Sequence, residues 1–151
     1  MAIGSSTSLA RAIGVPVTSA LVDGNGQALP GEQFYIPGSV LQVRGDPSHP
    51  IGYGLPERLD VFYDNNPVFL RPSTPDVQSI AWFDSANPVR SGWAWGQQRL
   101  AGATAVADVS IGPGKLILIG PLVAFRAQPH GTFKLPFNSL HYARAEAARL
   151  R

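Results

Sequence analysis

The chain contains no cysteine, which excludes disulfide bonds, thiolate metal sites and a cysteine nucleophile. Charged residues make up only 15% of its 151 residues and hydrophobic residues 44%, so a disordered, charge-rich chain is excluded. No apolar run approaches the ~20 residues that a membrane-spanning helix requires. The N-terminus also lacks the charged start and long apolar core of a signal peptide. A length of 151 residues is typical of one domain with its own hydrophobic core.

Lysine is nearly absent, and the formal charge of +2 rests on ten arginines spread along the chain. Arg144, Arg149 and Arg151 gather near the C-terminus, but no aromatic residues interleave with them. This pattern favours a solvated helix end, where cations complement the helix dipole, over a nucleic-acid surface. We therefore expect no nucleic-acid partner.

Apolar periodicity predicts an α/β fold in which a mixed sheet has a C-terminal hairpin and flanking helices. The predicted short strands cover residues 34–36, 39–44, 59–63, 80–83, 104–111 and 115–120, and the predicted helices cover 5–13 and a segment that begins near Leu135. The strand 115–120 is apolar on both faces, as in a central strand that is covered on both sides. In the last helix, Phe137, Leu140 and Ala147 are predicted to form the buried face.

The best candidate site is the polar loop between the strand 115–120 and the last helix. It carries Arg126, Gln128, His130 and Lys134 at a position where α/β sheets place functional groups. The two cations would hold an anion or a carboxylate near the helix N-terminus, or His130 would act as a general base. The alternative is that His130 caps the start of the helix while the cations face solvent, since no nucleophile is visible beside it.

His49 is a second candidate for binding, because it is placed within Asp46-Pro-Ser-His-Pro50. A ligand-binding or basic role in a cleft is one interpretation. The alternative is a turn in which Asp46 binds backbone N–H groups and His49 makes one structural hydrogen bond.

Metal and cofactor motifs are not found in the sequence. His141 follows His130 by eleven residues, about 16 Å along a helix, which is too far for a shared metal. There is no His-x-x-Glu motif, no phosphate-binding loop and no Gly-x-Ser-x-Gly elbow. We therefore expect neither a metal nor a cofactor.

All three tryptophans of the chain lie between residues 82 and 95. Trp82, Phe83, Trp93 and Trp95 would either stack on a sugar or peptide ring or serve as packing for the core and a lid.

Four ordered segments resemble a known bacterial domain. They are residues 35–44 (YIPGSVLQVR), 46–56 (DPSHPIGYGLP), 61–69 (VFYDNNPVF) and 125–134 (FRAQPHGTFK), the last followed by Phe137-Asn138. Together they resemble the domain that follows the catalytic domain in bacterial zinc carboxypeptidases of the carboxypeptidase A type. That domain is similar to class I glutamine amidotransferases, and the resemblance covers about residues 5–143.

The resemblance implies that the parent protein's zinc site lies in a separate upstream domain and that the amidotransferase cysteine nucleophile is absent. It places His130 near the catalytic histidine of such folds. It also implies that residues 1–151 form a single, partial amidotransferase-like domain whose first α/β units precede Met1. The parent family suggests an exported or periplasmic protein, whereas the compartment of this chain stays open.

Two hypotheses about function follow. The leading one is a non-catalytic accessory or interaction module, which packs on an upstream catalytic domain or self-associates through an exposed sheet edge. The alternative is an amidotransferase-like hydrolase that uses His130 as general base, with Asp46 or Asp108 orienting it.

Overall fold

One curled mixed sheet organises the chain in the computed structural model, which describes residues 1–143 and 145. The strands run in the order β1-β7-β6-β4-β2-β3, and β5 branches off by pairing with β2. They are β1 (Ala2–Ile3), β2 (Ser39–Gly45), β3 (Arg58–Tyr63), β4 (Val77–Trp82), β5 (Val89–Ser91), β6 (Thr104–Ile111) and β7 (Gly114–Ile119). The predicted α/β class with a mixed sheet is therefore confirmed.

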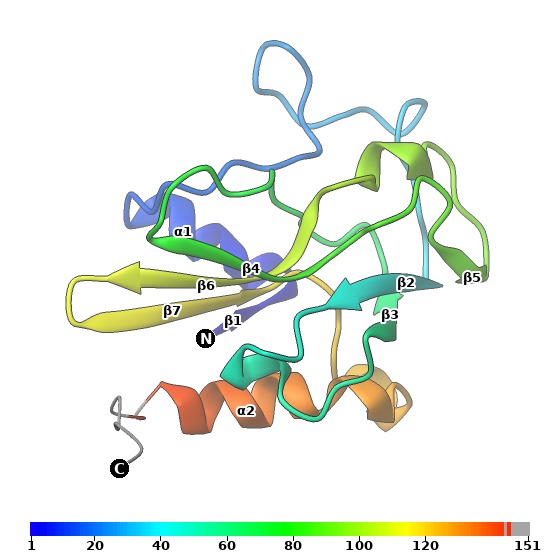
Figure 1. Ribbon diagram of the computed structural model, residues 1–151. Helices are drawn as coiled ribbons and strands as arrows, with labels where there is room; N and C mark the ends of the chain where they lie inside the picture. Colours follow the sequence, from blue (N-terminus) through cyan, green and yellow to red (C-terminus); the bar gives the residue numbers. More distant parts are fainter. Residues whose placement is uncertain (144, 146–151) are drawn as a thin grey trace.

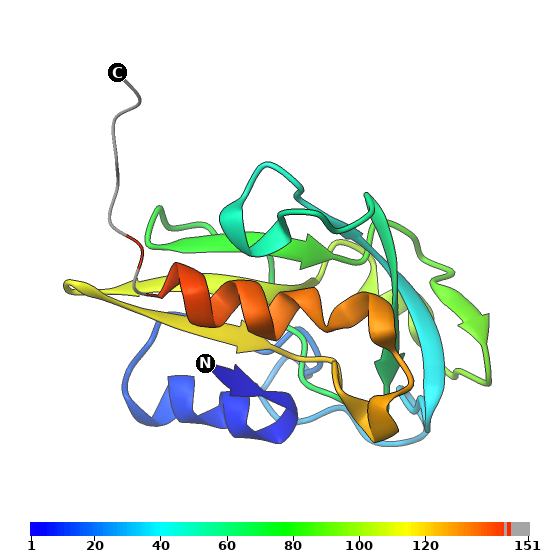
Figure 2. The ribbon, with the colours of Figure 1, turned by 90° about the horizontal axis from the view of Figure 1, so that it is seen from below.

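Two α-helices lie on opposite faces of this sheet (Figures 1 and 2). They are α1 (Leu9–Ala12) and α2 (Lys134–Tyr142), and the 3₁₀ segments are η1 (Gly4–Ser8), η2 (Pro50–Gly52), η3 (Gln97–Leu100), η4 (Phe125–Ala127) and η5 (His130–Thr132). None of the described helices is both long and apolar enough to cross a bilayer.

The hairpin of β6 and β7 is the centre of the fold. The two strands are antiparallel, and β7 also pairs in parallel with β1, so that Ala2 lies opposite Leu118. Ile117 and Ile119 pack in the same core as Leu135 of α2, whereas Leu116 and Leu118 belong to a second core on the α1 side. The prediction that both faces of this strand are covered is confirmed, but β7 is not central, because only the two-residue β1 lies beyond it in the sheet.

One predicted strand is absent, and two strands of the sheet, β1 and β5, were not predicted. Residues 34–36 form no strand, because Tyr35 makes only an isolated bridge, to Trp95, before Pro37 and Gly38 redirect the chain. In contrast, a strand that the sequence did not predict, β1, precedes the first helix. Its two residues are too few to show an alternating pattern, and parallel pairing with β7 defines it.

The predicted buried face of α2 is also wrong. Phe137 and Leu140 are 61% and 59% exposed, while Leu135 and Ser139 are buried. Apolar periodicity failed here because the helix packs on its neighbours largely through polar side chains, which such a pattern does not detect. Ala147 and the three C-terminal arginines, Arg144, Arg149 and Arg151, lie outside the described residues.

Leu135 is expected to be the apolar anchor of α2. Leu135→Ala should lower the free energy of unfolding by about 2–5 kcal/mol, because it leaves a cavity at a fully buried site. Leu140→Ala on the same helix is the matched control and should change it by less than about 0.5 kcal/mol, because Leu140 is exposed. Urea denaturation of both variants measures the difference. Equal losses of unfolding free energy would contradict the assignment of Leu135 as the buried anchor and of Leu140 as exposed.

Candidate functional site

The four loop residues of the predicted site follow β7 but do not converge. Arg126, Gln128 and His130 are exposed on η4, η5 and the turn between them. Lys134 begins α2, and its Nζ donates a 2.7 Å hydrogen bond to the carbonyl oxygen of Gly54. This lysine therefore helps to hold the helix, and the predicted loop presents the other three side chains to solvent.

Aromatic stacking holds the loop in place. Phe125 stacks on Phe62 of β3 with ring centroids 4.0 Å apart, and the Arg126 guanidinium lies 5.2 Å from the Phe125 ring centroid. The His130 ring lies against Phe133, with centroids 5.3 Å apart. Within residues 1–143 and 145, neither His130 nor Arg126 forms an ion pair with a carboxylate.

His49 belongs to a different group of side chains, which is buried under α2. Its Nε2 lies 3.4 Å from Oδ2 of Asp108, and the same oxygen accepts a 3.1 Å hydrogen bond from Nζ of Lys115. His49 and Asp108 are 9% and 3% exposed. The Tyr142 ring covers the group, 5.1 Å from the His49 ring and 4.6 Å from the Lys115 ammonium. We call these four residues the Asp108 cluster.

One side of α2 carries the contacts that close over the Asp108 cluster. Residues four apart on a helix share a face, and Lys134, Asn138 and Tyr142 all contact the segment 49–54. Asn138 Nδ2 donates to the carbonyl oxygens of Ile51 and Tyr53 at 2.9 and 3.0 Å. Figure 1 shows η2 beside the helix, so the loop around His49 is fixed along the length of α2.

The charges of the Asp108 cluster stabilise one another. Burial alone would raise the pKa of Asp108, but hydrogen bonds from His49 and Lys115 outweigh it and lower the pKa below its usual value. Contact with Tyr142 is the largest cause that raises the pKa of Lys115, with burial opposing it and Asp108 adding to it. Asp108 and Lys115 therefore form a carboxylate–ammonium pair at neutral pH within the cluster.

The contacts of His49 indicate a structural role and not proton transfer to a substrate. Its Nδ1 accepts a 3.2 Å hydrogen bond from the backbone N–H of Ile51, so Nε2 carries the proton and faces Asp108. Both ring nitrogens are thus occupied within the fold. A general base needs a free nitrogen directed at a substrate.

The turn interpretation of the segment before η2 is confirmed for Asp46. Its Oδ1 accepts hydrogen bonds from the backbone N–H and the hydroxyl of Ser48, at 2.9 and 2.6 Å. The hydroxyl of Ser48 is the main cause that lowers the pKa of Asp46.

The sequence did not reveal that Asp108 is buried. Apolar and polar side chains alternate along β6, and this alternation puts Asp108 on the same face as Ser110, which is exposed. The hairpin register puts Asp108 opposite Ile117 and Ser110 opposite Lys115, so the charged pair lies on one face of the hairpin. An acid and a base at neighbouring cross-strand positions would have indicated the pair, but recognising these positions requires the hairpin register.

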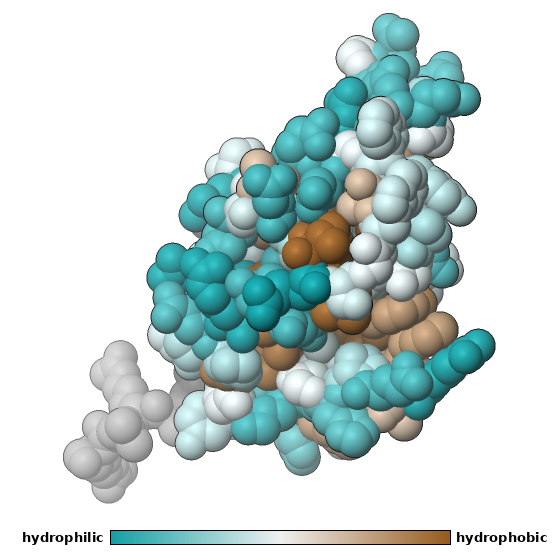
Figure 3. All heavy atoms as spheres, turned by 90° about the vertical axis from the view of Figure 1, so that its right-hand side faces the viewer, coloured by the Kyte–Doolittle hydropathy of each residue, from teal (hydrophilic) through white to brown (hydrophobic). Residues whose placement is uncertain are grey.

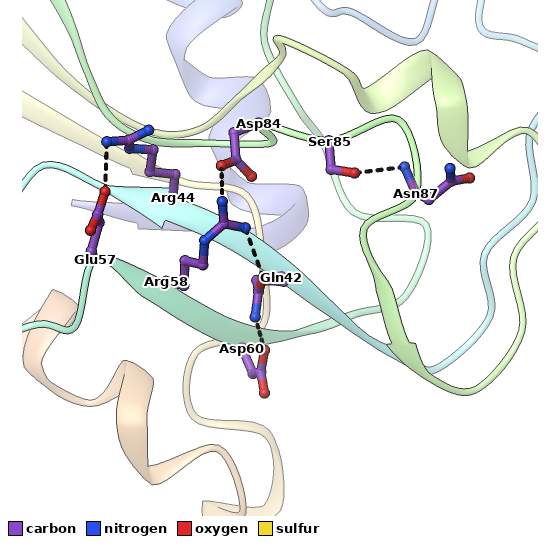
Figure 4. Close-up of polar contacts among 8 residues, drawn as sticks. All are labelled: Gln42, Arg44, Glu57, Arg58, Asp60, Asp84, Ser85 and Asn87. Carbon is purple, nitrogen blue, oxygen red and sulfur yellow. Dashed lines mark hydrogen bonds and ion pairs between the residues drawn. The ribbon is translucent and has the colours of Figure 1, made fainter.

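A third polar group lies on the surface of β2 and β3 (Figure 4). Arg58 bridges Asp84 and Gln42 at 3.1 Å each, and Gln42 reaches Asp60 at 3.3 Å. Arg44 and Glu57 form a separate exposed pair. The Asp84 side chain is 16% exposed, but its partner Arg58 is 57% exposed, and surface pairs contribute about 0–1 kcal/mol each, so we interpret this group as a solvated face of the sheet.

The aromatic residues divide into two kinds. Phe83 is fully buried and Trp82 is partly buried, as the packing interpretation expects. Trp93 and Trp95 are 54% and 55% exposed, so they are not core residues, and their exposure does not test the lid part of the packing interpretation.

No cation site emerges from the described part of the chain, where no group of three or more histidine and acidic side chains is arranged to hold a metal. No family model, no curated protein and no solved structure matches the chain.

The Asp108 cluster makes a prediction about acid stability. Asp108→Asn keeps the shape but removes the charge, and it should cost about 1.5–3 kcal/mol of unfolding free energy at pH 7. The folded-state pKa of Asp108 is lowered. The stabilisation that its charge contributes to folding is therefore present above about pH 4, and it is lost as the pH falls through the folded-state pKa. The difference between parent and variant should therefore shrink in acid.

Urea denaturation at pH 7 and at about pH 3 measures this difference. Glu57→Gln is the control, because it removes a carboxylate from an exposed ion pair and should have little effect at either pH. A loss in Asp108→Asn that is equally large at both pH values would contradict the charge-pair assignment.

Proposed function

We propose that this chain is a non-catalytic accessory or interaction module, of the kind that its resemblance to the C-terminal domain of bacterial zinc carboxypeptidases implies. The observation that carries the proposal is a set of exposed apolar side chains on both helices. Leu9 and Ile13, at α1, and Phe137 and Leu140, on α2, are each half exposed or more. Leu9 and Ile13 lie on one face of the sheet and Phe137 and Leu140 on the other, and large apolar side chains that are exposed in this way favour contact with another protein.

The sheet edge between the helices supports the same proposal. β1 pairs only with Leu118 and Ile119 of β7. The preceding residues of β7, beginning at Gly114, have no strand partner on that side among the described residues. An open edge with flanking apolar side chains is a surface that a neighbouring domain or a second copy would cover. We call this edge with Leu9, Ile13, Phe137 and Leu140 the β7-edge surface.

The resemblance directs the choice of partner toward an upstream catalytic domain. Self-association through the same edge is what the isolated chain would do in the absence of that domain, because its apolar side chains then have no other cover.

A hydrolase that uses His130 gains no support from the contacts. Asp108, one of the two acids considered as its orienting group, pairs with His49, and Asp46 binds Ser48. A histidine base is normally oriented by a carboxylate or a carbonyl group. The described residues provide no such carboxylate beside His130.

The interaction proposal predicts reversible self-association of the isolated chain at high micromolar concentration. The double substitution Phe137→Glu with Leu140→Glu should abolish it, because charge cannot be buried without a partner. Leu70→Glu, at an exposed leucine outside the β7-edge surface, is the matched control and should associate like the parent. Sedimentation velocity over a concentration series measures this, and a parent chain that is monomeric throughout would count against the surface.

The non-catalytic part of the proposal has its own assay. The purified chain should not release C-terminal residues from peptides and should not hydrolyse simple amides or esters. Release that stops on chelation would overturn the proposal, and hydrolysis that is lost in His130→Ala would establish the hydrolase instead.

A further inference from the structure

Three exposed aromatic side chains lie together at the end of the sheet remote from β1. Tyr35 is 46% exposed and comes from the segment before β2, while Trp93 and Trp95 come from the loop between β5 and η3. Figure 1 shows β5 and η3 at the right of the molecule, and Figure 3 views that side, whose surface is largely hydrophilic. We call these three residues the aromatic platform.

Backbone pairing and a ring contact bring the three side chains together. Tyr35 and Trp95 exchange two backbone hydrogen bonds, of 3.0 and 2.9 Å, so they lie directly opposite each other. Side chains of opposite residues share a face, which places Tyr35 and Trp95 on one side. The ring centroids of Tyr35 and Trp93 are 6.2 Å apart in an edge-to-face contact.

Buried groups hold the platform rigid. The hydroxyl of Ser39, a residue that is 1% exposed, accepts a hydrogen bond from the Trp93 N–H and donates one to its carbonyl oxygen, at 2.9 and 2.6 Å. Gly92 and Gly96 flank the tryptophans at positive φ, and a Cβ atom at either would clash with Ser39 or with the backbone of Gln33. The tryptophans are therefore exposed by a fixed scaffold, and a preorganised surface loses little conformational entropy on binding.

Polar side chains border the platform. A hollow of about 380 Å³ beside Trp95 is lined by Glu32, Gln33, Gln98 and Arg99, among other residues. Arg99 Nη2 donates a 3.0 Å hydrogen bond to Gln33 Oε1, so the charge of Arg99 is partly satisfied within the fold. Carboxylate, amide and guanidinium groups at this rim offer both acceptors and donors, which suits a ligand rich in hydroxyl groups.

We propose that the aromatic platform binds a neutral oligosaccharide, with a pyranose ring stacked on tryptophan and its hydroxyl groups bonded to the polar rim. A pyranose combines an apolar C–H face with hydroxyl edges, as the platform combines apolar ring faces with polar neighbours. This binding goes beyond the interaction role proposed above, because it uses the opposite end of the sheet from the β7-edge surface.

The hydrogen bonding of Trp95 favours a saccharide over a proline-rich peptide. Peptides in the polyproline conformation dock into aromatic grooves, where the backbone carbonyl groups need a donor. The Nε1–H of Trp95 already donates to the carbonyl oxygen of Glu32 at 2.7 Å. It is not available to a peptide carbonyl, whereas stacking of a sugar requires only the ring face.

The test is a titration of the full chain with hexasaccharides of β-1,4-linked glucose, β-1,4-linked N-acetylglucosamine and α-1,4-linked glucose, followed by tryptophan fluorescence and calorimetry. At least one should bind. Trp93→Ala and Trp95→Ala should each weaken that binding by about tenfold or more. Tyr53→Ala, at an exposed tyrosine outside the platform, is the control and should bind like the parent.

Trp95→Phe separates stacking from other roles of the indole. It keeps an aromatic face but loses the Nε1–H, so it should retain most of the affinity that Trp95→Ala loses. Thermal melting and NMR spectra verify that each variant is folded.

Three results would overturn the proposal: no hexasaccharide in the series binds, the alanine variants bind as tightly as the parent, or a proline-rich decapeptide binds in their place with the same dependence on tryptophan. None of these results bears on the β7-edge surface, whose variants are different.

Discussion

The buried carboxylate of Asp108 is the constraint on which the α2 side of the molecule depends. A charge that is 3% exposed is stable only with partners, and Asp108 takes them from two other segments: His49 before η2 and Lys115 on β7. These contacts bring the loop around His49 against the central hairpin. α2 then closes over that loop, with Asn138 bonded to its carbonyl groups and Tyr142 over the charges.

The polar attachment of α2 has consequences for the surface of the protein. Because Asn138 and Tyr142 join Leu135 on the inward side, Phe137 and Leu140 are turned outward to solvent. The other end of the sheet exposes aromatic rings for a different reason, since a buried serine and two glycines hold their backbone. The two proposed surfaces thus lie at the two ends of one sheet and differ in the side chains that they expose.

Local patterns in the sequence were sufficient for the centre of the fold. Strong β-propensity on both sides of Gly112-Pro113-Gly114 identified the hairpin, and its unbroken apolar run identified β7 as the covered strand. The loop with Arg126 and His130 was correctly placed after β7. The position of a loop, however, does not determine what its side chains contact, and here Lys134 contacts Gly54.

The sequence by itself determined the α/β class, the central hairpin, the absence of cysteine chemistry and the turn at Asp46, because each depends on composition or on residues close together in the chain. Only the tertiary structure decided that His49 pairs with Asp108 and that Trp93 and Trp95 are exposed. Those properties depend on side chains from distant segments, and a polar contact or a solvent-exposed ring leaves no periodic pattern along the chain.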